Sequence, residues 1–215
     1  MSNLKIYCGN YGSGKTEIAL NAALGAGEGA TLIDLDLVNP YFTSSEHRDL
    51  LARAGVDVVS PVYAASQVDI PAVPAILNTL FDQADRRLIV DVGGTETGAV
   101  ALGRYAAQIA HTGYEMFLVV NALRPFSSTV EEIVTLAAQI EEKSRLKITA
   151  LINNTNLQLE TTPEMVSEGM ALCRAAAQRL GLPVTAVYAL PHVLAALPEE
   201  WAVRPIRLFT RPEWL

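Results

Sequence analysis

Short apolar runs recur along the chain and alternate with longer stretches of helical character. Strands that are apolar throughout are typical of a mainly parallel sheet covered by helices on both faces, because neither face meets water. We therefore expect an α/β fold with seven strands. The expected strands are Leu4–Cys8, Ala30–Asp34, Val56–Val59, Leu88–Val92, Met116–Val120, Ile148–Ile152 and Val184–Tyr188, with helices near 15–25, 44–54, 70–84, 98–111, 127–144 and 162–181.

The length of 215 residues suits one domain, which we place at residues 1–198. Residues 199–215 hold two prolines and two tryptophans and are expected to form an irregular tail packed on the body, with a partner-binding arm as the alternative. Residues 180–198 lack Asp, Glu, Lys and Arg, which is nearly the length of a membrane span. Gly181, Pro183 and Pro191 interrupt that stretch, so we expect a buried strand and turn there.

A glycine-rich loop directly follows the first expected strand. Residues 9–16, Gly-Asn-Tyr-Gly-Ser-Gly-Lys-Thr, match G-x-x-x-x-G-K-[ST] at every fixed position, between a strand and a helix. Glycines allow a tight turn that aims successive N–H groups at phosphate oxygens, and the start of the helix adds the positive end of its dipole. Lys15 is expected on the β- and γ-phosphates, and the Thr16 hydroxyl on Mg²⁺. The alternative is a glycine-rich turn that only caps a buried helix.

A Rossmann dinucleotide site is the main competitor for this loop. It requires G-x-G-x-x-G and an acidic residue about 20 positions further on, a role that Asp34 would fill. The glycines here stand at Gly9, Gly12 and Gly14, which is a different spacing, and Lys15 and Thr16 would have no role. The pattern therefore favours a phosphate loop.

Carboxylates stand at the ends of two expected strands, where Mg²⁺ and the γ-phosphate should lie. Asp91 follows four apolar residues, as in a Walker B strand, and is expected to hold Mg²⁺ directly or through water. Asp36 is expected to orient the attacking water or a metal-bound water. Gly94 is expected to supply a backbone N–H near the γ-phosphate and a hinge for a switch loop. The alternative for any one acid is a cap on the next helix.

Three motifs resemble, in their order along the chain, those of the MinD/ParA/CobQ-type P-loop NTPases of the SIMIBI class: the phosphate loop, the pair Asp34 and Asp36 followed by Asn39-Pro40, and the Asp-Val-Gly-Gly segment at 91–94. The resemblance implies a three-layer sandwich with seven or eight mainly parallel strands, an Mg-nucleotide site and often a nucleotide-dependent dimer. Lys15 and Asp36 would be catalytic, and Thr16, Asp36 and Asp91 would surround the metal. The expected nucleotide-binding residues are Asn10, Tyr11, Gly12, Ser13, Gly14, Lys15, Thr16, Glu17, Gly94, Asn153 and Asn154.

One departure from the resembling family concerns its signature lysine, which reaches the partner's nucleotide across the dimer. The matching position holds Asn10, and the chain has four lysines in all: Lys5, Lys15, Lys143 and Lys147. None of the others is a neighbour of the loop in sequence. Arg48, Arg104 and Arg124 are possible substitutes, with Arg124 best placed after a strand; the alternative for each is a solvated surface arginine.

The base preference is predicted from residues 153–156, which follow a strand. Related GTPases carry Asn-Lys-x-Asp there, and the aspartate accepts hydrogen bonds from guanine. Asn156 stands at that last position, and an amide does not supply the paired acceptors of a carboxylate. We therefore expect ATP rather than GTP, with Asn153 or Asn154 reading the adenine edge. A simple polar turn is the alternative.

Composition narrows the possible partners. The net charge of −7 and the absence of a basic run argue against nucleic acid, and two separated cysteines, Cys8 and Cys173, fit a reducing cytoplasm. The segment Asn39–Phe42 is expected to form part of a switch or partner surface, or to pack as an anchor.

Two functions remain open: a slow ATPase that switches a protein partner or a homodimer, and a ligase of the BioD/CobQ kind that activates a carboxylate with the γ-phosphate. A nucleotide-binding protein with negligible turnover is a third, less specific reading.

Overall fold

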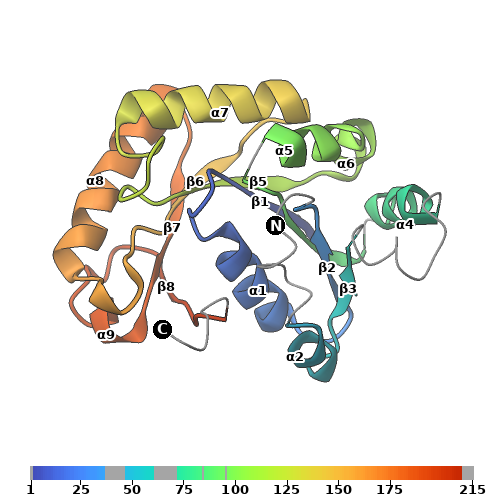
Figure 1. Cartoon of the computed structure of the whole chain (residues 1–215), viewed down its shortest axis with the longest axis horizontal. Coiled ribbons are helices and arrows are strands. Elements are labelled where there is room, and N and C mark those ends of the chain that lie inside the picture. Colours follow the sequence, from blue (N-terminus) through green and yellow to red (C-terminus); the bar gives the residue numbers. More distant parts are fainter. Residues whose placement is uncertain (1, 37–46, 61–71, 84, 95, 210–215) are drawn as a thin grey trace.

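The computed structural model describes residues 2–36, 47–60, 72–83, 85–94 and 96–209, with only the backbone at 72–75 and 96. The segment Asn39–Phe42 lies outside the described residues. One eight-stranded sheet runs through the molecule in the order β3-β2-β4-β1-β5-β6-β7-β8, and all neighbouring strands are parallel. The strands are β1 Leu4–Cys8, β2 Ala30–Asp34, β3 Asp57–Val59, β4 Arg87–Asp91, β5 Glu115–Val120, β6 Ala150–Asn153, β7 Val184–Ala189 and β8 Val203–Pro205 (Figure 1).

The first strand lies in the interior of the sheet, between β4 and β5. Its alternate residues Leu4, Ile6 and Cys8 join one hydrophobic cluster, whereas Tyr7 joins the cluster on the opposite face. Both faces are therefore dry, which explains why the strand is apolar nearly throughout. The carboxyl end of β1 is the point from which the phosphate loop leaves the sheet.

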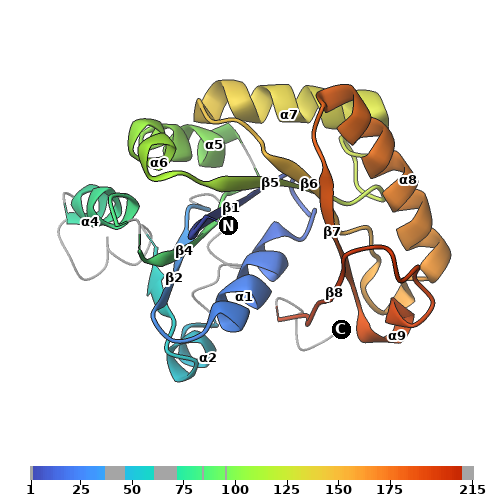
Figure 2. The ribbon, with the colours of Figure 1, turned by 180° about the vertical axis from the view of Figure 1, so that it is seen from behind.

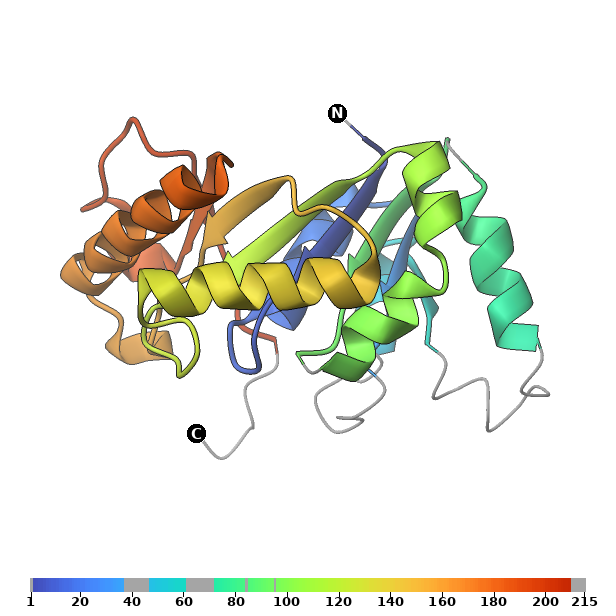
Figure 3. The same cartoon turned by 90° about the horizontal axis from the view of Figure 1, so that it is seen from above.

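Helices cover both faces and complete the expected three-layer α/β sandwich. Helices α5, α7 and α8 lie on one side of the sheet and α1 on the other (Figures 1 and 3). A Thr129–Glu132 capping box starts α7, and Pro163 follows the Thr162 cap at the start of α8. The α-helices are α1 Lys15–Ala26, α2 Arg48–Arg53, α4 Ala72–Phe81, α5 Glu96–Gly103, α6 Ala106–Thr112, α7 Val130–Ser144, α8 Pro163–Leu180 and α9 Pro191–Leu194, and Gln158–Glu160 form a short 3₁₀ helix.

One predicted helix is divided in the structure. The helix expected near 98–111 is broken into α5 and α6 around Arg104 and Tyr105. A Cβ added to Gly103 would lie 2.6 Å from the carbonyl oxygen of Lys143, so the backbones of α5 and α7 are in contact at this glycine. The charge-free stretch before Pro198 contains β7 and the short helix α9, and among the described residues no helix is long and apolar enough to cross a membrane.

The expectation of a wholly irregular tail at 199–215 is wrong at Val203–Pro205, which form the edge strand β8 beside β7. The chain then passes along α1 (Figure 2). Asn21 donates from Nδ2 to the carbonyl of Arg207 at 2.8 Å, and its Oδ1 accepts from the Arg207 N–H at 3.0 Å. The N–H of Phe209 donates to the Glu17 carboxylate. The end of the described chain is thus fastened to the helix that follows the phosphate loop.

Candidate functional site

The glycine-rich loop has the backbone that its sequence predicts. Gly9, Gly12 and Gly14 have φ angles of 152°, 74° and 84°, a region that other residues rarely occupy. The Ser13 N–H donates to the Asn10 carbonyl at 3.2 Å and closes the turn. Helix α1 begins at Lys15 behind Gly14, and no side chain caps its first N–H groups. These groups are thus available to an anion.

Asn154 holds this loop from the neighbouring part of the sheet. Its Nδ2 donates to the Ser13 carbonyl at 2.8 Å, and its side chain is buried. A Cβ on Gly14 would lie 2.2 Å from that nitrogen, so glycine is required there by close contact as well as by φ. The Asn154 amide nitrogen therefore supports the loop backbone, and the role of Asn154 in reading a base stays a prediction.

Thr16 and Asp91 meet at the start of α1. Asp91 is buried, and the Thr16 hydroxyl donates a hydrogen bond to its carboxylate. The Asp91 Oδ1 atom has no hydrogen-bond partner and no access to solvent. Burial, followed by the nearby carboxylate of Asp34, raises the pKa of Asp91 to about 7, whereas Lys15 acts in the opposite direction. A buried carboxylate oxygen beside a threonine hydroxyl is an environment that a hard cation would stabilise.

The other acids converge on the same place. The Asp36 N–H donates to Asp34 Oδ1 at 2.9 Å, and the Leu35 N–H donates to the Asp91 carbonyl at 2.8 Å. A Cβ on Gly93 would lie 3.0 Å from Asp36 Oδ1, so Asp36 reaches the turn after β4. Among the described residues no group of three His, Cys, Asp or Glu side chains forms a metal site by itself. A cation here would need further oxygen ligands from phosphate and water.

Gly94 packs directly on the phosphate loop. A Cβ at this position would be 2.8 Å from Lys15 Nζ and 2.8 Å from the Tyr11 backbone nitrogen. Lys15 is itself buried, and its Nζ donates to the Asn10 carbonyl at 3.5 Å, which is the long limit of a hydrogen bond. The Tyr11 side chain is 63% exposed at the tip of the loop. The turn after β4 and the lysine are thus in contact, and the predicted role of Gly94 beside a γ-phosphate stays a prediction.

Arg124 lies on the opposite side of the loop. A Cβ on Gly12 would be 3.5 Å from both Cδ and Nε of Arg124, and this Nε is buried without a hydrogen-bond partner. Asn10 Nδ2 donates to the Pro125 carbonyl at 2.6 Å and ties the turn that carries Arg124 to the loop. Arg48 begins α2 and Arg104 lies between α5 and α6. The structure therefore favours Arg124 among the three arginines.

Two further residues that the sequence predicts to bind nucleotide have side-chain partners elsewhere. Asn153 is fully buried; its Nδ2 donates to the Val166 carbonyl at 3.0 Å, and its Oδ1 accepts from the Thr155 N–H and hydroxyl. Its side chain thus joins β6 to α8. Glu17 is 5% exposed and its carboxylate accepts from the Phe209 N–H, so its side chain anchors the C-terminal segment.

Asn156 takes part in the local turn. Its Nδ2 donates to the Asn154 carbonyl at 2.7 Å, and its Oδ1 accepts from the Gln158 N–H at 3.2 Å. The Asn156 side chain therefore has the partners of a polar turn. The Asn154 Oδ1 atom, by contrast, is buried without a hydrogen-bond partner.

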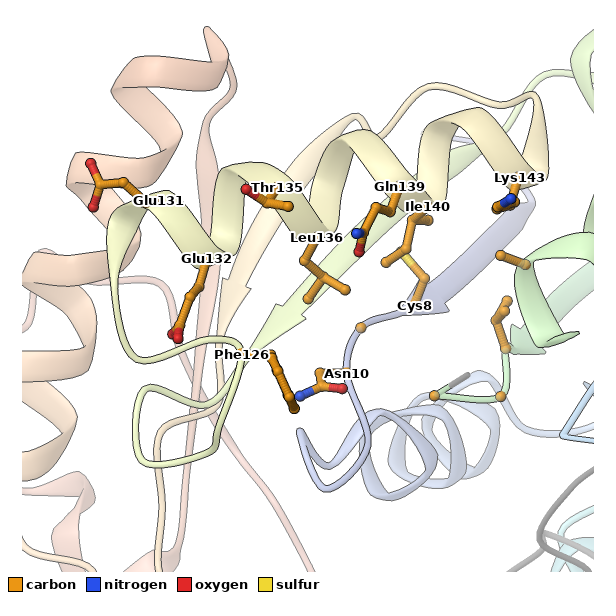
Figure 4. A pocket seen from close by; sticks show the side chains of 15 residues that line it. Cys8, Asn10, Phe126, Glu131, Glu132, Thr135, Leu136, Gln139, Ile140 and Lys143 are labelled. Atoms are coloured by element: carbon orange, nitrogen blue, oxygen red, sulfur yellow. The ribbon is translucent and has the colours of Figure 1, made fainter. Parts of the chain in front are cut away.

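A cavity of about 440 Å³ opens beside the loop, and the sequence did not reveal it. One wall is α7, through Leu136, Gln139, Ile140 and Lys143, and the opposite wall is formed by the end of β1 and the turn after β4 (Figure 4). Gly9, Asn10 and Gly94 line both this cavity and the phosphate loop. The sequence does contain a pattern that indicates this wall, because the spacing of these four α7 residues places them on one face of the helix.

Comparisons with known proteins show the fold. No protein-family model and no curated protein sequence matches the chain. Similar solved structures include the cell division protein FtsY from Thermotoga maritima (TM-score 0.54, 15% identity) and the chloroplast FtsY from Physcomitrella patens (0.54, 16%). The signal recognition particle receptor FtsY from Elizabethkingia anophelis, in complex with GDP, matches with a TM-score of 0.52 and 16% identity.

In each comparison 87% of this chain is covered, but only 61%, 58% and 57% of the respective FtsY chains. The fold is therefore that of P-loop NTPases, and this chain spans less than two thirds of the length of these structures.

Proposed function

We propose that this protein binds an Mg-nucleotide at the loop Gly9–Thr16 and acts as a slow ATPase whose nucleotide state controls a protein partner or a second copy of the chain. The observation that carries the proposal is the unpaired, buried Oδ1 of Asp91 beside the Thr16 hydroxyl, at the uncapped start of α1. A cation would neutralise that carboxylate, and the free N–H groups would receive phosphate oxygens.

Thr16 and Asp91 would hold Mg²⁺, with Asp36 near enough to orient water. The metal would neutralise charge that develops on the transferring phosphoryl group. Lys15 would turn its ammonium from the Asn10 carbonyl toward the phosphates, and Gly94 would then lie next to the γ-phosphate. Because Gly94 lies against Lys15 and Tyr11, a γ-phosphate bound to Lys15 would alter this contact, which is the proposed basis of the switch.

Arg124 is proposed as the second cation of the site, acting within one chain. Its guanidinium lies against Gly12 with a buried, unpaired Nε, and the resembling family's signature lysine is absent at Asn10. Guanidinium groups bind phosphate oxygens with several aligned donors. A partner's lysine would then not be needed to neutralise the nucleotide.

ATP is the proposed nucleotide, with GTP as the alternative. Asn156 in place of an aspartate supports ATP, whereas the GDP in one similar structure belongs to that protein and motivates the GTP test. The other function, ligation through carboxylate activation, is favoured by one specific observation: the cavity that shares Gly94 and Asn10 with the loop.

Thermal shift with Mg-ATP and Mg-GTP, on the parent protein and on Lys15→Ala, tests nucleotide binding. We expect stabilisation of the parent that Lys15→Ala largely removes; equal stabilisation of both proteins would refute the assignment of the loop. Phosphate release by Asp36→Ala tests turnover. It should slow while nucleotide binding persists, and an unchanged rate would remove Asp36 from the mechanism.

A further inference from the structure

The cavity beside the phosphate loop has a mainly apolar wall. Leu136 and Ile140 of α7 face Cys8, Val92 and Ala99 across it, as the close view shows for the α7 side chains and Cys8 (Figure 4). Burial raises the pKa of the Cys8 thiol to about 12, so this group stays neutral and behaves as an apolar surface. A volume of about 440 Å³ is within the range of small-molecule sites.

The charged side chains that line the cavity differ in whether they have partners. The Glu132 carboxylate accepts hydrogen bonds from the N–H groups of Ser128 and Thr129 at the start of α7, at 2.8 and 3.2 Å. Glu131 pairs with Arg179 at 2.6 Å and points away from the cavity in Figure 4. Lys143, at the other end of the α7 wall, has no ion-pair or hydrogen-bond partner within the described part of the chain.

We propose that this cavity is a second binding site, for a small molecule with an apolar body and a single carboxylate. The body would lie against Leu136 and Ile140, and the carboxylate would meet Lys143, with the Gln139 amide beside it. A single negative charge is favoured over a phosphate because one ammonium, that of Lys143, lines the cavity and the Glu132 carboxylate stands at its opposite end.

The cavity lies directly beside the proposed nucleotide site. Gly9, Asn10 and Gly94 form its border with the phosphate loop. A bound carboxylic acid would therefore lie next to the nucleotide site without sharing Thr16 or Asp91. The binding of this ligand needs no nucleotide, which separates its test from that of the proposed function.

Isothermal titration of the nucleotide-free protein with octanoate, 1-octanol and octylamine tests the proposal. These probes share one apolar body and differ in the charge of their end group. We expect octanoate to bind more tightly than octanol, and octylamine to bind most weakly. Equal affinities for the three probes, or tighter binding of octylamine, would overturn the proposal.

Two variants and a control locate the site. Lys143→Gln should weaken the binding of octanoate about 3- to 10-fold and leave the affinity for octanol unchanged. The expected loss is modest because an exposed ammonium contributes little to the binding of a carboxylate. Leu136→Trp should weaken both probes by filling the cavity, in protein whose far-ultraviolet circular dichroism matches the parent. Lys147→Gln, an exposed lysine near the same helix end, should change neither affinity. An octanoate affinity that is equal in Lys143→Gln and Lys147→Gln would overturn the assignment, as would full binding by Leu136→Trp.

Discussion

The Arg124 side chain lies against Gly12, so that a Cβ on this glycine would be 3.5 Å from Cδ and Nε of the arginine. The two residues belong to turns that leave neighbouring parallel strands, β1 and β5, at the same edge of the sheet. The Asn10 amide adds a hydrogen bond to the Pro125 carbonyl, between residues 115 positions apart. A cation is thus held over the phosphate loop by strand order and one side-chain hydrogen bond.

Arg124→Ala should weaken nucleotide binding about 10-fold or more, because a charge-assisted hydrogen bond to phosphate contributes about 1.5–3 kcal/mol. Arg124→Lys should recover part of the affinity, since it restores charge without the planar fork. Fluorescence titration with a labelled nucleotide measures both. Arg104→Ala, at an exposed arginine away from the loop, serves as the control; an equal loss in this variant would contradict a specific role for Arg124.

Asn10→Ala should weaken nucleotide binding in the same direction as Arg124→Ala but less strongly, because it only releases the turn that positions the arginine. The two changes should be non-additive in a double-mutant cycle, since they act through one contact. Titration of the two single variants and the double variant gives the coupling free energy. Additive losses would mean that Asn10 acts on the nucleotide independently of Arg124.

Gly14→Ala should destabilise the protein by about 1–3 kcal/mol and abolish tight nucleotide binding. The new Cβ would meet Asn154 Nδ2 at 2.2 Å and would demand a φ of 84° from alanine. Gly25→Ala is the matched control in the same helix, because its Cβ would meet nothing within 4 Å; it should stabilise by about 0.5–1 kcal/mol. Urea unfolding measures both, and similar signs for the two changes would be evidence against the close contact.

The apo protein should lose stability as the pH rises from about 4 to about 7, through Asp91. The unfolded chain loses this proton near the ordinary value of 3.8, whereas the buried carboxyl keeps it until about 7. The folded state therefore binds more protons in that window, and the free energy of unfolding falls with pH. Asp91→Asn should lack this component, so its melting temperature relative to the parent should rise from pH 5 to pH 8 without Mg²⁺. A constant difference would contradict the raised pKa.

Glu17→Ala should release the C-terminal segment and leave nucleotide binding nearly unchanged. The carboxylate that accepts from the Phe209 N–H would be lost, so hydrogen exchange at residues 207–209 should increase. Nucleotide affinity should stay within about 3-fold of the parent, which is an effect of about 0.7 kcal/mol or less, since the carboxylate is engaged by the Phe209 N–H. Loss of affinity with unchanged exchange would restore the direct nucleotide contact that the sequence suggested.

The strands and the phosphate loop were predictable because their signals are local. A strand buried on both faces must be apolar nearly throughout, and the loop needs glycines at φ values that the sequence pattern encodes. The edge strand β8 has only three residues, two of them exposed, Arg204 and Pro205, so nothing in its sequence distinguishes it from a loop. Its strand character comes from its neighbour β7.

The side-chain directions around the site could not be read from the sequence, because their partners are distant along the chain. Asn154 faces Ser13, 141 positions away, while the adjacent Asn153 faces α8. Glu17 looked like part of the loop region until the tail, 192 positions later, supplied its partner. The α7 face that lines the cavity has the spacing of an ordinary buried stripe, and only the position of the turn after β4 leaves space in front of it.

The position of β1 between β4 and β5 has a consequence for synthesis. The complete glycine-rich motif precedes its neighbours Gly94, Arg124 and Asn154 in the chain, so these neighbours are synthesised much later than the motif. A nascent chain or fragment that stops before residue 154 would carry every residue of the motif but lack the amide that holds the Ser13 carbonyl. The loop therefore gains this support only when Asn154 has been added to the chain.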